Sequence, residues 1–194
     1  MILTDREITA LMQSGELTFS PPLEADQVKA SAIDLRLGYN FSVYPYDTSN
    51  LPEAIRSILS QTVDLRDESK VVQFISTLRR QHNKTLQDGA PIELPRGALL
   101  LAETLEDFKL PDNIAARIEG RSTYARLGIA VHQTAPSVKP GWSGQLTSEI
   151  VNNGPFTYKL YPKMRLCQLI LEQLGTSVNI PDKSTWQNLK FGSL

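Results

Sequence analysis

Cysteine and histidine are scarce in this sequence. Its 194 residues include one cysteine, Cys167, and two histidines. An intramolecular disulfide is therefore excluded. Familiar zinc sites are excluded too, because they draw most of their ligands from these two residue types. Cys167 lies in the apolar run 166–171, which predicts a small core residue rather than a reactive nucleophile.

A surplus of basic residues is also missing. The formal net charge is -1 and the pI is near 6.1, which argues against nucleic acid polymers and anionic membranes as partners. A few local arginines can still hold a small polyanion. The first residues resemble no signal peptide, and no apolar run is long enough to span a bilayer. We therefore expect a cytoplasmic protein.

The length and composition are those of one globular domain. Hydrophobic residues make up 41% of the chain, which suffices for a core without disulfides or metals. We expect a single domain over residues 1–194. Within it, the pattern predicts an N-terminal elaboration with helices over 1–90, a β core over 91–175 and a C-terminal arm over 176–194.

The first forty residues mix helical and extended patterns. Thr4 and Glu7 form a capping-box pattern before an apolar helical face, and Gly15 is a plausible end of that helix. Residues 17–22 are expected to be extended. Residues 31–38 alternate between apolar and polar, which predicts a half-buried strand, and residues 41–44 are expected to pair with it.

The next region carries weaker signals. A short apolar stripe within residues 47–70 favours a helix on the outside of the molecule, and residues 71–78 fit either a helix or a strand. From residue 91 onward, short strand-like runs alternate with proline and glycine turns. This spacing is typical of a sandwich or barrel, and the predicted strands are 97–105, 113–119, 128–132, 144–152, 156–160 and 164–173.

The segment Gly120–Arg126, with the sequence GRSTYAR, has the chemistry of a phosphate-binding turn. Arg121 and Arg126 offer planar forks to phosphate oxygens, while Ser122 and Thr123 add hydroxyl donors. A helical turn that begins at Ser122 would add favourable potential at its N-terminus. The spacing alone is equally compatible with an ordinary capped turn and solvated arginines.

Two further features stand out downstream. In residues 131–144, the small residues Thr134 and Ala135 would let a flat base approach the backbone, although an ordinary hairpin loop fits this segment as well. Glu149 is a lone carboxylate in an otherwise uncharged strand. Arg121 or Arg126 could be its partner, and such a carboxylate can move protons. A solvent-facing position on the sheet is the alternative.

Two other polar residues have simpler interpretations. His132 is expected to be packed or hydrogen-bonded, because no serine–histidine–carboxylate or metal-ligand spacing surrounds it. Asp34 is expected to cap the chain locally or to pair with Arg36 on the polar face of its strand.

Taken together, the ordered motifs resemble one family, the dCTP deaminases. The resemblance covers most of the chain and is strongest over residues 95–172. The segments that carry it are MILTDREI at the start, SAIDLRLG (31–38), LLLAETLE (99–106), GRSTYARLGIAVHQTA (120–135), PGWSG (140–144), SEIVNNG (148–154) and PKMRLCQL (162–169).

The resemblance implies a mainly β fold, a distorted jelly-roll-like barrel shared with trimeric dUTP diphosphatases. It implies a homotrimer with active sites at the subunit interfaces and a free pyrimidine deoxynucleoside triphosphate as substrate. Magnesium would be carried by the triphosphate. Zinc, which many deaminases use, would not be required.

The resemblance also assigns roles to residues. Glu149 would be the general acid–base, with Ser122 and Arg126 near the reacting base. The triphosphate would be bound by Arg121, Ser122 and Thr123. The base would be read at Thr134 and Ala135, and Gln168 in the last motif would complete the substrate-binding set.

Two departures from the family pattern bear on the substrate. Lys139 stands where an acidic residue commonly contacts the sugar, and Pro136-Ser137 replaces a basic residue. In the tail, residues 183–188 are only a partial match to the segment that closes over the phosphates. Deamination of dCTP to dUTP and ammonia is the first hypothesis. A dUTP diphosphatase or bifunctional enzyme is the second, and a binding relative without turnover is the third.

Overall fold

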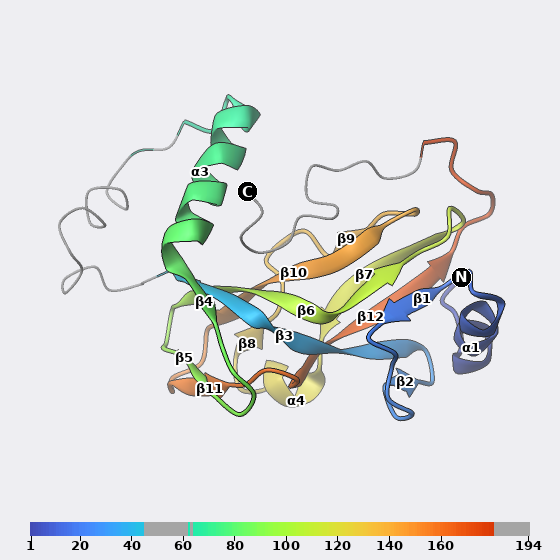
Figure 1. The fold of residues 1–194 in the computed structure, drawn as a ribbon, viewed down its shortest axis with the longest axis horizontal. Helices are drawn as coiled ribbons and strands as arrows, with labels where there is room; N and C mark the ends of the chain where they lie inside the picture. The colour runs from blue at the N-terminus through green and yellow to red at the C-terminus, as the bar shows by residue number, and fades with distance from the viewer. Residues whose placement is uncertain (45–61, 63, 181–194) are drawn as a thin grey trace.

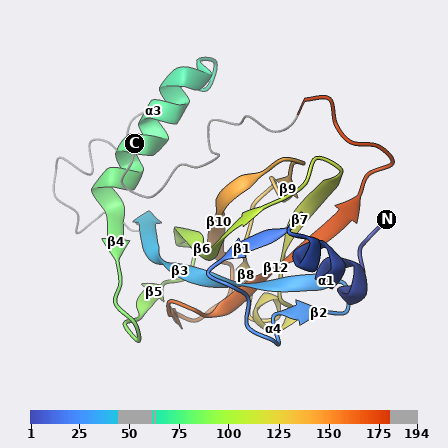
Figure 2. The ribbon, with the colours of Figure 1, turned by 45° about the vertical axis from the view of Figure 1, so that its right-hand side comes forward.

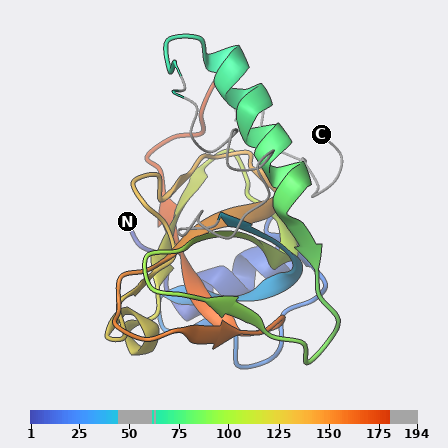
Figure 3. The ribbon, with the colours of Figure 1, turned by 90° about the vertical axis from the view of Figure 1, so that its left-hand side faces the viewer.

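The molecule is built around one curled β-sheet. The computed structural model describes residues 1–44, 62 and 64–180. Ten strands of these residues form a sheet with the central order β8-β10-β6-β3-β12-β7-β9, to which β1, β2 and β4 add at the sides. The sheet curls into an open half-barrel (Figure 3). The expected mainly β class with few helices is confirmed.

The elements follow the predicted strand runs closely in the second half of the chain. The strands are β1 (Thr18–Ser20), β2 (Val28–Lys29), β3 (Ala32–Tyr44), β4 (Asn83–Thr85), β5 (Ile92–Leu94), β6 (Leu99–Lys109), β7 (Ile114–Gly120), β8 (Ile129–Ala130), β9 (Ser137–Val138), β10 (Ser143–Asn152), β11 (Tyr158–Leu160) and β12 (Arg165–Gln173). The helices are α1 (Asp5–Ser14), α3 (Glu68–His82) and α4 (Ser122–Ala125).

Strand β3 differs from expectation in two ways. Residues 31–38 and 41–44 do not pair with each other but form one continuous strand, which lies between β6 and β12 at the centre of the sheet. Its register on β6 shifts between Leu37 and Phe41. Gly38 permits this, because a Cβ there would lie 3.1 Å from two β6 carbonyl oxygens. A β-bulge continues a strand past such a shift.

The expectation that β3 is half-buried is also wrong, because residues 32–38 are all buried. Its apolar face contributes to the hydrophobic core. Its polar face, with Asp34 and Arg36, is covered by charged partners from β2 and from β6. Charged side chains can be buried in this way when they are paired and hydrogen-bonded.

The N-terminal helix forms as the sequence predicts. Both hydrogen bonds of the capping box between Thr4 and Glu7 are present in α1, and Gly15 ends the helix at φ 79°. A left-handed backbone of this kind favours glycine. Ile8 is fully buried, so α1 packs its apolar face onto the sheet beside β2 and β12 (Figure 2).

Helix α3 resolves the open alternative at residues 71–78. Asp67 caps its N-terminus by accepting a hydrogen bond from the backbone of Lys70, and its last turn is basic. The helix rises from the end of the sheet where β3 and β4 meet (Figure 1). Arg79 is anchored to Glu103 of β6 by a buried ion pair of 3.3 Å. The helix expected within 47–70 lies largely outside the described residues, as does most of the C-terminal arm.

The described part of the chain contains no helix that is both long enough and apolar enough to cross a membrane.

Cys167 is 1% exposed and belongs to the hydrophobic core. Burial is the main cause that raises the pKa of this thiol to about 12. The prediction that Cys167 is a small core residue is therefore confirmed.

Candidate active site

The predicted phosphate-binding turn forms a short helix. Strand β7 ends at Gly120, Arg121 is the N-cap residue, and α4 starts at Ser122 as expected. Ser122, Thr123 and Arg126 are exposed. The turn therefore presents two hydroxyls and a guanidinium to the outside, which suits the recognition of a phosphate chain.

Two glycines hold this turn against the end of β10. Gly128 has φ 84°, and a Cβ there would lie 2.5 Å from the backbone nitrogen of Gly154. A Cβ on Gly154 would lie 2.1 Å from the carbonyl oxygen of Leu127. The amide of Asn153 donates to the Gly128 carbonyl oxygen at 2.8 Å. Only glycine fits so close a backbone approach, and it fixes the turn next to the strand that carries Glu149.

Glu149 lies in the middle of β10, opposite Leu101 of β6. Its side chain lines a pocket of about 660 Å³ together with Ala135, Trp142 and residues of α3 such as Phe74. Burial is the largest cause that raises the pKa of Glu149 above its usual value of 4.5. A half-buried carboxylate of raised pKa in a pocket is suited to accept and donate protons.

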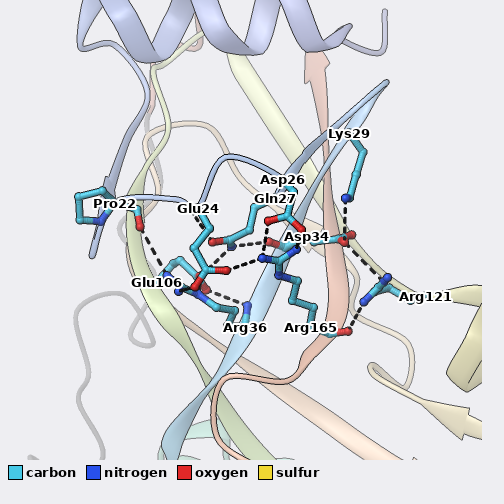
Figure 4. A network of polar contacts seen from close by, with 10 residues as sticks. All are labelled: Pro22, Glu24, Asp26, Gln27, Lys29, Asp34, Arg36, Glu106, Arg121 and Arg165. Atoms are coloured by element: carbon cyan, nitrogen blue, oxygen red, sulfur yellow. Dashed lines mark hydrogen bonds and ion pairs between the residues drawn. The ribbon is translucent and has the colours of Figure 1, made fainter.

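The arginine partner suggested for Glu149 is not found within one chain. No hydrogen bond or ion pair within the described residues joins Glu149 to Arg121 or Arg126. Arg121 instead places its Nε 3.6 Å from Asp34 Oδ2 and donates from Nη1 to the carbonyl oxygen of Arg165 at 2.8 Å. Figure 4 shows the Arg121 side chain directed at Asp34. This contact could not be predicted from the sequence, because residues 34 and 121 are far apart along the chain.

The expected pairing of Asp34 with Arg36 is wrong as well. Arg36 donates from Nε to Glu106 at 2.7 Å and from Nη1 to Glu24 at 2.5 Å. Glu106 belongs to β6, the neighbour of β3 on one side, whereas Asp34 faces Lys29 at 3.9 Å and Arg121. The two side chains share a face of the strand, but each is drawn to a different neighbouring element.

A row of polar residues crosses three adjacent strands. Asp34 of β3 is opposite Gln168 of β12, and Gln168 is opposite Glu119 of β7. Residues in register on neighbouring antiparallel strands point to the same face. His132 Nε2 lies 3.7 Å from Glu119, and the electrostatic influence of His132 reaches Glu149. Gln168 therefore lies between Asp34, which faces Arg121, and Glu119, which faces His132.

The predicted base-reading residues are separated in their exposure to the pocket. Both residues are exposed, but Ala135 lines the same pocket as Glu149 and Thr134 does not. Trp142 is buried and donates from its ring nitrogen to the carbonyl oxygen of Gly144 at 3.1 Å, which fixes the turn that follows Lys139. In the described residues, no group of three His, Cys, Asp or Glu side chains is arranged to hold a metal ion.

Two features of the site were not predicted from the sequence. One is Asp34 as the partner of Arg121. The other is the wall that α3 contributes to the pocket through Phe74, Ile75 and Leu78. The signal for the wall was present, since these residues recur at helical spacing, but the pattern did not distinguish a helix from a strand.

Comparisons with known proteins agree with this architecture. A family model described as dCTP deaminase-like matches residues 2–174. The protein "dCTP deaminase, dUMP-forming" of Methanobrevibacter smithii is 32% identical over 190 residues, which cover 98% of this chain and 89% of that protein. A "dCTP deaminase" of Thermomicrobium roseum is 35% identical over 182 residues, which cover 93% and 84%.

A solved structure shows the same fold. The crystal structure of 2'-deoxycytidine 5'-triphosphate deaminase from Agrobacterium tumefaciens matches with a TM-score of 0.63 and 24% identity. The match covers 88% of this chain and 47% of that one. The extent of the family match and the identity to its members decide the assignment: this chain belongs to the dCTP deaminase-like family.

Proposed function

We propose that the protein deaminates dCTP by hydrolysis. The observation that carries this proposal is the half-buried Glu149, the one charged residue of β10, in a pocket shared with the base-reading position Ala135. The names of the relatives, dCTP deaminase and dUMP-forming dCTP deaminase, agree with it. The reaction joins water to C4 of cytosine and releases the 4-amino group as ammonia.

In this mechanism Glu149 moves the protons. Its carboxylate takes a proton from the attacking water as the oxygen bonds to C4. It passes this proton to N3, then takes the proton of the C4 hydroxyl in the tetrahedral adduct and passes it to the departing amine, so that ammonia leaves and the 4-oxo group of uracil remains. General acid–base catalysis of this kind contributes roughly 100- to 10,000-fold to a rate. Ser122 and Arg126 are proposed to lie near the base, where their donors would hold developing negative charge.

The triphosphate is proposed to bind at the turn that begins with Arg121. Ser122 and Thr123 offer exposed hydroxyls, and Arg121 is the N-cap residue of α4. Magnesium would accompany the phosphates rather than occupy a protein cage, as is usual for this ion. Gln168, in the polar row beside Arg121, is proposed to contact the substrate, and Thr134 is proposed to face the base through its backbone.

The site is proposed to be completed by neighbouring subunits of a homotrimer. Within one chain, no hydrogen bond or ion pair of the described residues joins the phosphate turn to Glu149. The turn also lies beside exposed apolar side chains, Leu127 at 45% and Phe156 at 64% exposure. Apolar residues grouped beside a polar site are typical of an interface between chains. Sedimentation equilibrium is expected to give the mass of a trimer.

A second candidate is conversion of dCTP to dUMP in one active site. Relatives of similar identity carry both names, for example those of Methanobrevibacter smithii at 32% and Thermomicrobium roseum at 35%. Lys139 counts against the second step, because diphosphatase chemistry usually relies on a carboxylate to orient the attacking water. A lysine at this position favours dUTP as the product.

Product analysis separates these candidates. Purified protein is incubated with magnesium and dCTP, and in parallel with dUTP, and the nucleotides are separated by chromatography. We expect dUTP from dCTP and no change in dUTP. Formation of dUMP from both would establish the bifunctional reaction. Triphosphate binding without any product would contradict both and favour a binding relative.

The pH dependence of the reaction is a further prediction. Because burial raises the pKa of Glu149 above 4.5, the carboxylate that accepts the proton from water is lost as the pH falls through that raised pKa. The value of kcat/KM for dCTP is therefore expected to fall on the acid side with a midpoint above 4.5. Initial rates measured from about pH 4 to pH 8 report this midpoint. A midpoint at or below the ordinary value would contradict the role of a buried carboxylate.

A further inference from the structure

Asp34 is a buried carboxylate that the proposed reaction does not use directly. Its side chain is 3% exposed, and Oδ2 accepts no hydrogen bond in the described part of the chain. Two cations face this oxygen, Lys29 Nζ at 3.9 Å and Arg121 Nε at 3.6 Å. A carboxylate removed from water requires such compensation. Asp34 and Arg121 therefore stabilise each other.

The carboxylate is attached to a rigid part of the backbone. The amide of Asp34 donates to the carbonyl oxygen of Gln27 at 2.8 Å, and Gln27 Nε2 donates to the carbonyl oxygen of Asp34 at 2.7 Å. Gln27 is fully buried and also donates to Glu106 at 2.9 Å. These bonds hold the β3 backbone in the centre of the sheet (Figure 4), so the negative charge of Asp34 is a fixed point for Arg121.

Arg121 is held from three sides and remains partly accessible. Its Nε faces Asp34, its Nη1 donates to the carbonyl oxygen of Arg165 at 2.8 Å, and its guanidinium carbon lies 6.0 Å from the centre of the Tyr124 ring. A guanidinium has five N–H groups. The contact at Nε and the bond from Nη1 engage two of them, which leaves three for a ligand. The side chain is 33% exposed, so a ligand can reach it.

We propose that Asp34 is a positioning residue for triphosphate binding. Together with the Arg165 carbonyl oxygen it fixes the Arg121 guanidinium, so that the three remaining N–H groups meet the phosphate oxygens without further ordering. Fixing a binding group before the ligand arrives raises affinity by reducing the conformational entropy lost on binding. This inference rests on the proposed function, in which Arg121 binds the triphosphate.

A double-mutant cycle tests the coupling. The Kd of dCTP with magnesium is measured by calorimetry in a Glu149→Gln background that binds without turnover, and KM and kcat are measured in the active background. Asp34→Asn, which keeps the shape and removes the charge, is expected to raise Kd and KM about tenfold, equivalent to about 1.4 kcal/mol, with kcat changed less than about threefold. In an Arg121→Ala protein, the same substitution is expected to have no further effect on Kd.

Two neighbours supply matched controls. Asp26 pairs with Arg165 at 2.5 Å but does not contact Arg121, so Asp26→Asn is expected to leave Kd within about twofold. Lys29→Ala removes the second cation beside Asp34 and is also expected to leave Kd within about twofold. Losses from either control equal to that of Asp34→Asn would overturn the positioning role, because the effect would then not depend on the contact between Asp34 and Arg121.

Arg121→Lys tests the same geometry without altering a buried residue. It keeps the charge but loses the planar fork, so its Kd is expected to approach that of Arg121→Ala. Wild-type affinity in Arg121→Lys, or additive losses in the cycle, would overturn the positioning role while leaving dCTP binding intact. Absence of dCTP binding in the parent protein would overturn the proposed function and this inference together.

Discussion

Glu149→Gln is expected to lower kcat for dCTP by roughly 100- to 10,000-fold while triphosphate affinity stays within a few-fold of wild type. The amide keeps the size of the side chain in the pocket but cannot accept a proton from water. The triphosphate contacts proposed at Arg121 and its neighbours lie on α4 and not on β10. The substitution therefore removes the proton carrier and leaves the phosphate site in place.

Ammonia release and calorimetric binding measure the two parts of this prediction. Glu172→Gln is the matched control. Glu172 is a carboxylate of β12 that pairs with Arg117 at 2.6 Å and does not line the pocket. Its kcat is expected to equal that of the wild type. Turnover by Glu149→Gln at the wild-type rate would contradict the assignment of Glu149 as acid–base.

The largest effect on stability is expected at Glu106, which is fully buried. It accepts hydrogen bonds from the backbone of Arg36 at 2.9 Å, from Arg36 Nε at 2.7 Å and from Gln27 Nε2 at 2.9 Å. Glu106→Ala removes this acceptor from three buried donors, one of which belongs to a charged guanidinium. Breaking a buried pair in this way costs about 3–5 kcal/mol of the free energy of unfolding, a large share of a total of about 5–15 kcal/mol.

Urea unfolding at a fixed protein concentration measures this loss. The midpoint is expected to fall with little change in slope. The matched control is Glu172→Ala, whose partner Arg117 lies at the similar distance of 2.6 Å but whose pair is partly exposed, with side-chain exposures of 42% for Arg117 and 33% for Glu172. Exposed pairs contribute about 0–1 kcal/mol. Equal losses in the free energy of unfolding from Glu106→Ala and Glu172→Ala would contradict the prediction, because burial would then add nothing to the contribution of Glu106.

The sequence predicts the elements whose signals are local. Thr4, Glu7 and Gly15 define α1 because capping and a left-handed end depend on residues within a few positions of one another. The strands of the second half are predicted for the same reason, since alternation and proline–glycine turns mark their ends. Strand β8 is shorter than its predicted run, with two residues, Ile129–Ala130.

Features that depend on distant partners could not be predicted in the same way. The continuity of β3 depends on the approach of β6 to Gly38. The residues near Gly38 in the sequence carry no signal that predicts this approach. The site shows the same limit. Glu149 stands out as a lone carboxylate in its strand, yet the partner of Arg121 is Asp34, far earlier in the chain. Alternation identifies the face on which a charge lies but does not identify its partner across the sheet.

The most direct test of zinc-independent deamination is ammonium release from dCTP by protein treated with a zinc-selective chelator, compared with protein treated with a general chelator that also removes magnesium. The proposed mechanism predicts undiminished ammonium release in the first sample, and in the second a loss that added magnesium restores. Loss of activity with the zinc-selective chelator, restored by zinc alone, would contradict zinc-independent deamination, because the attacking water would then be bound to zinc.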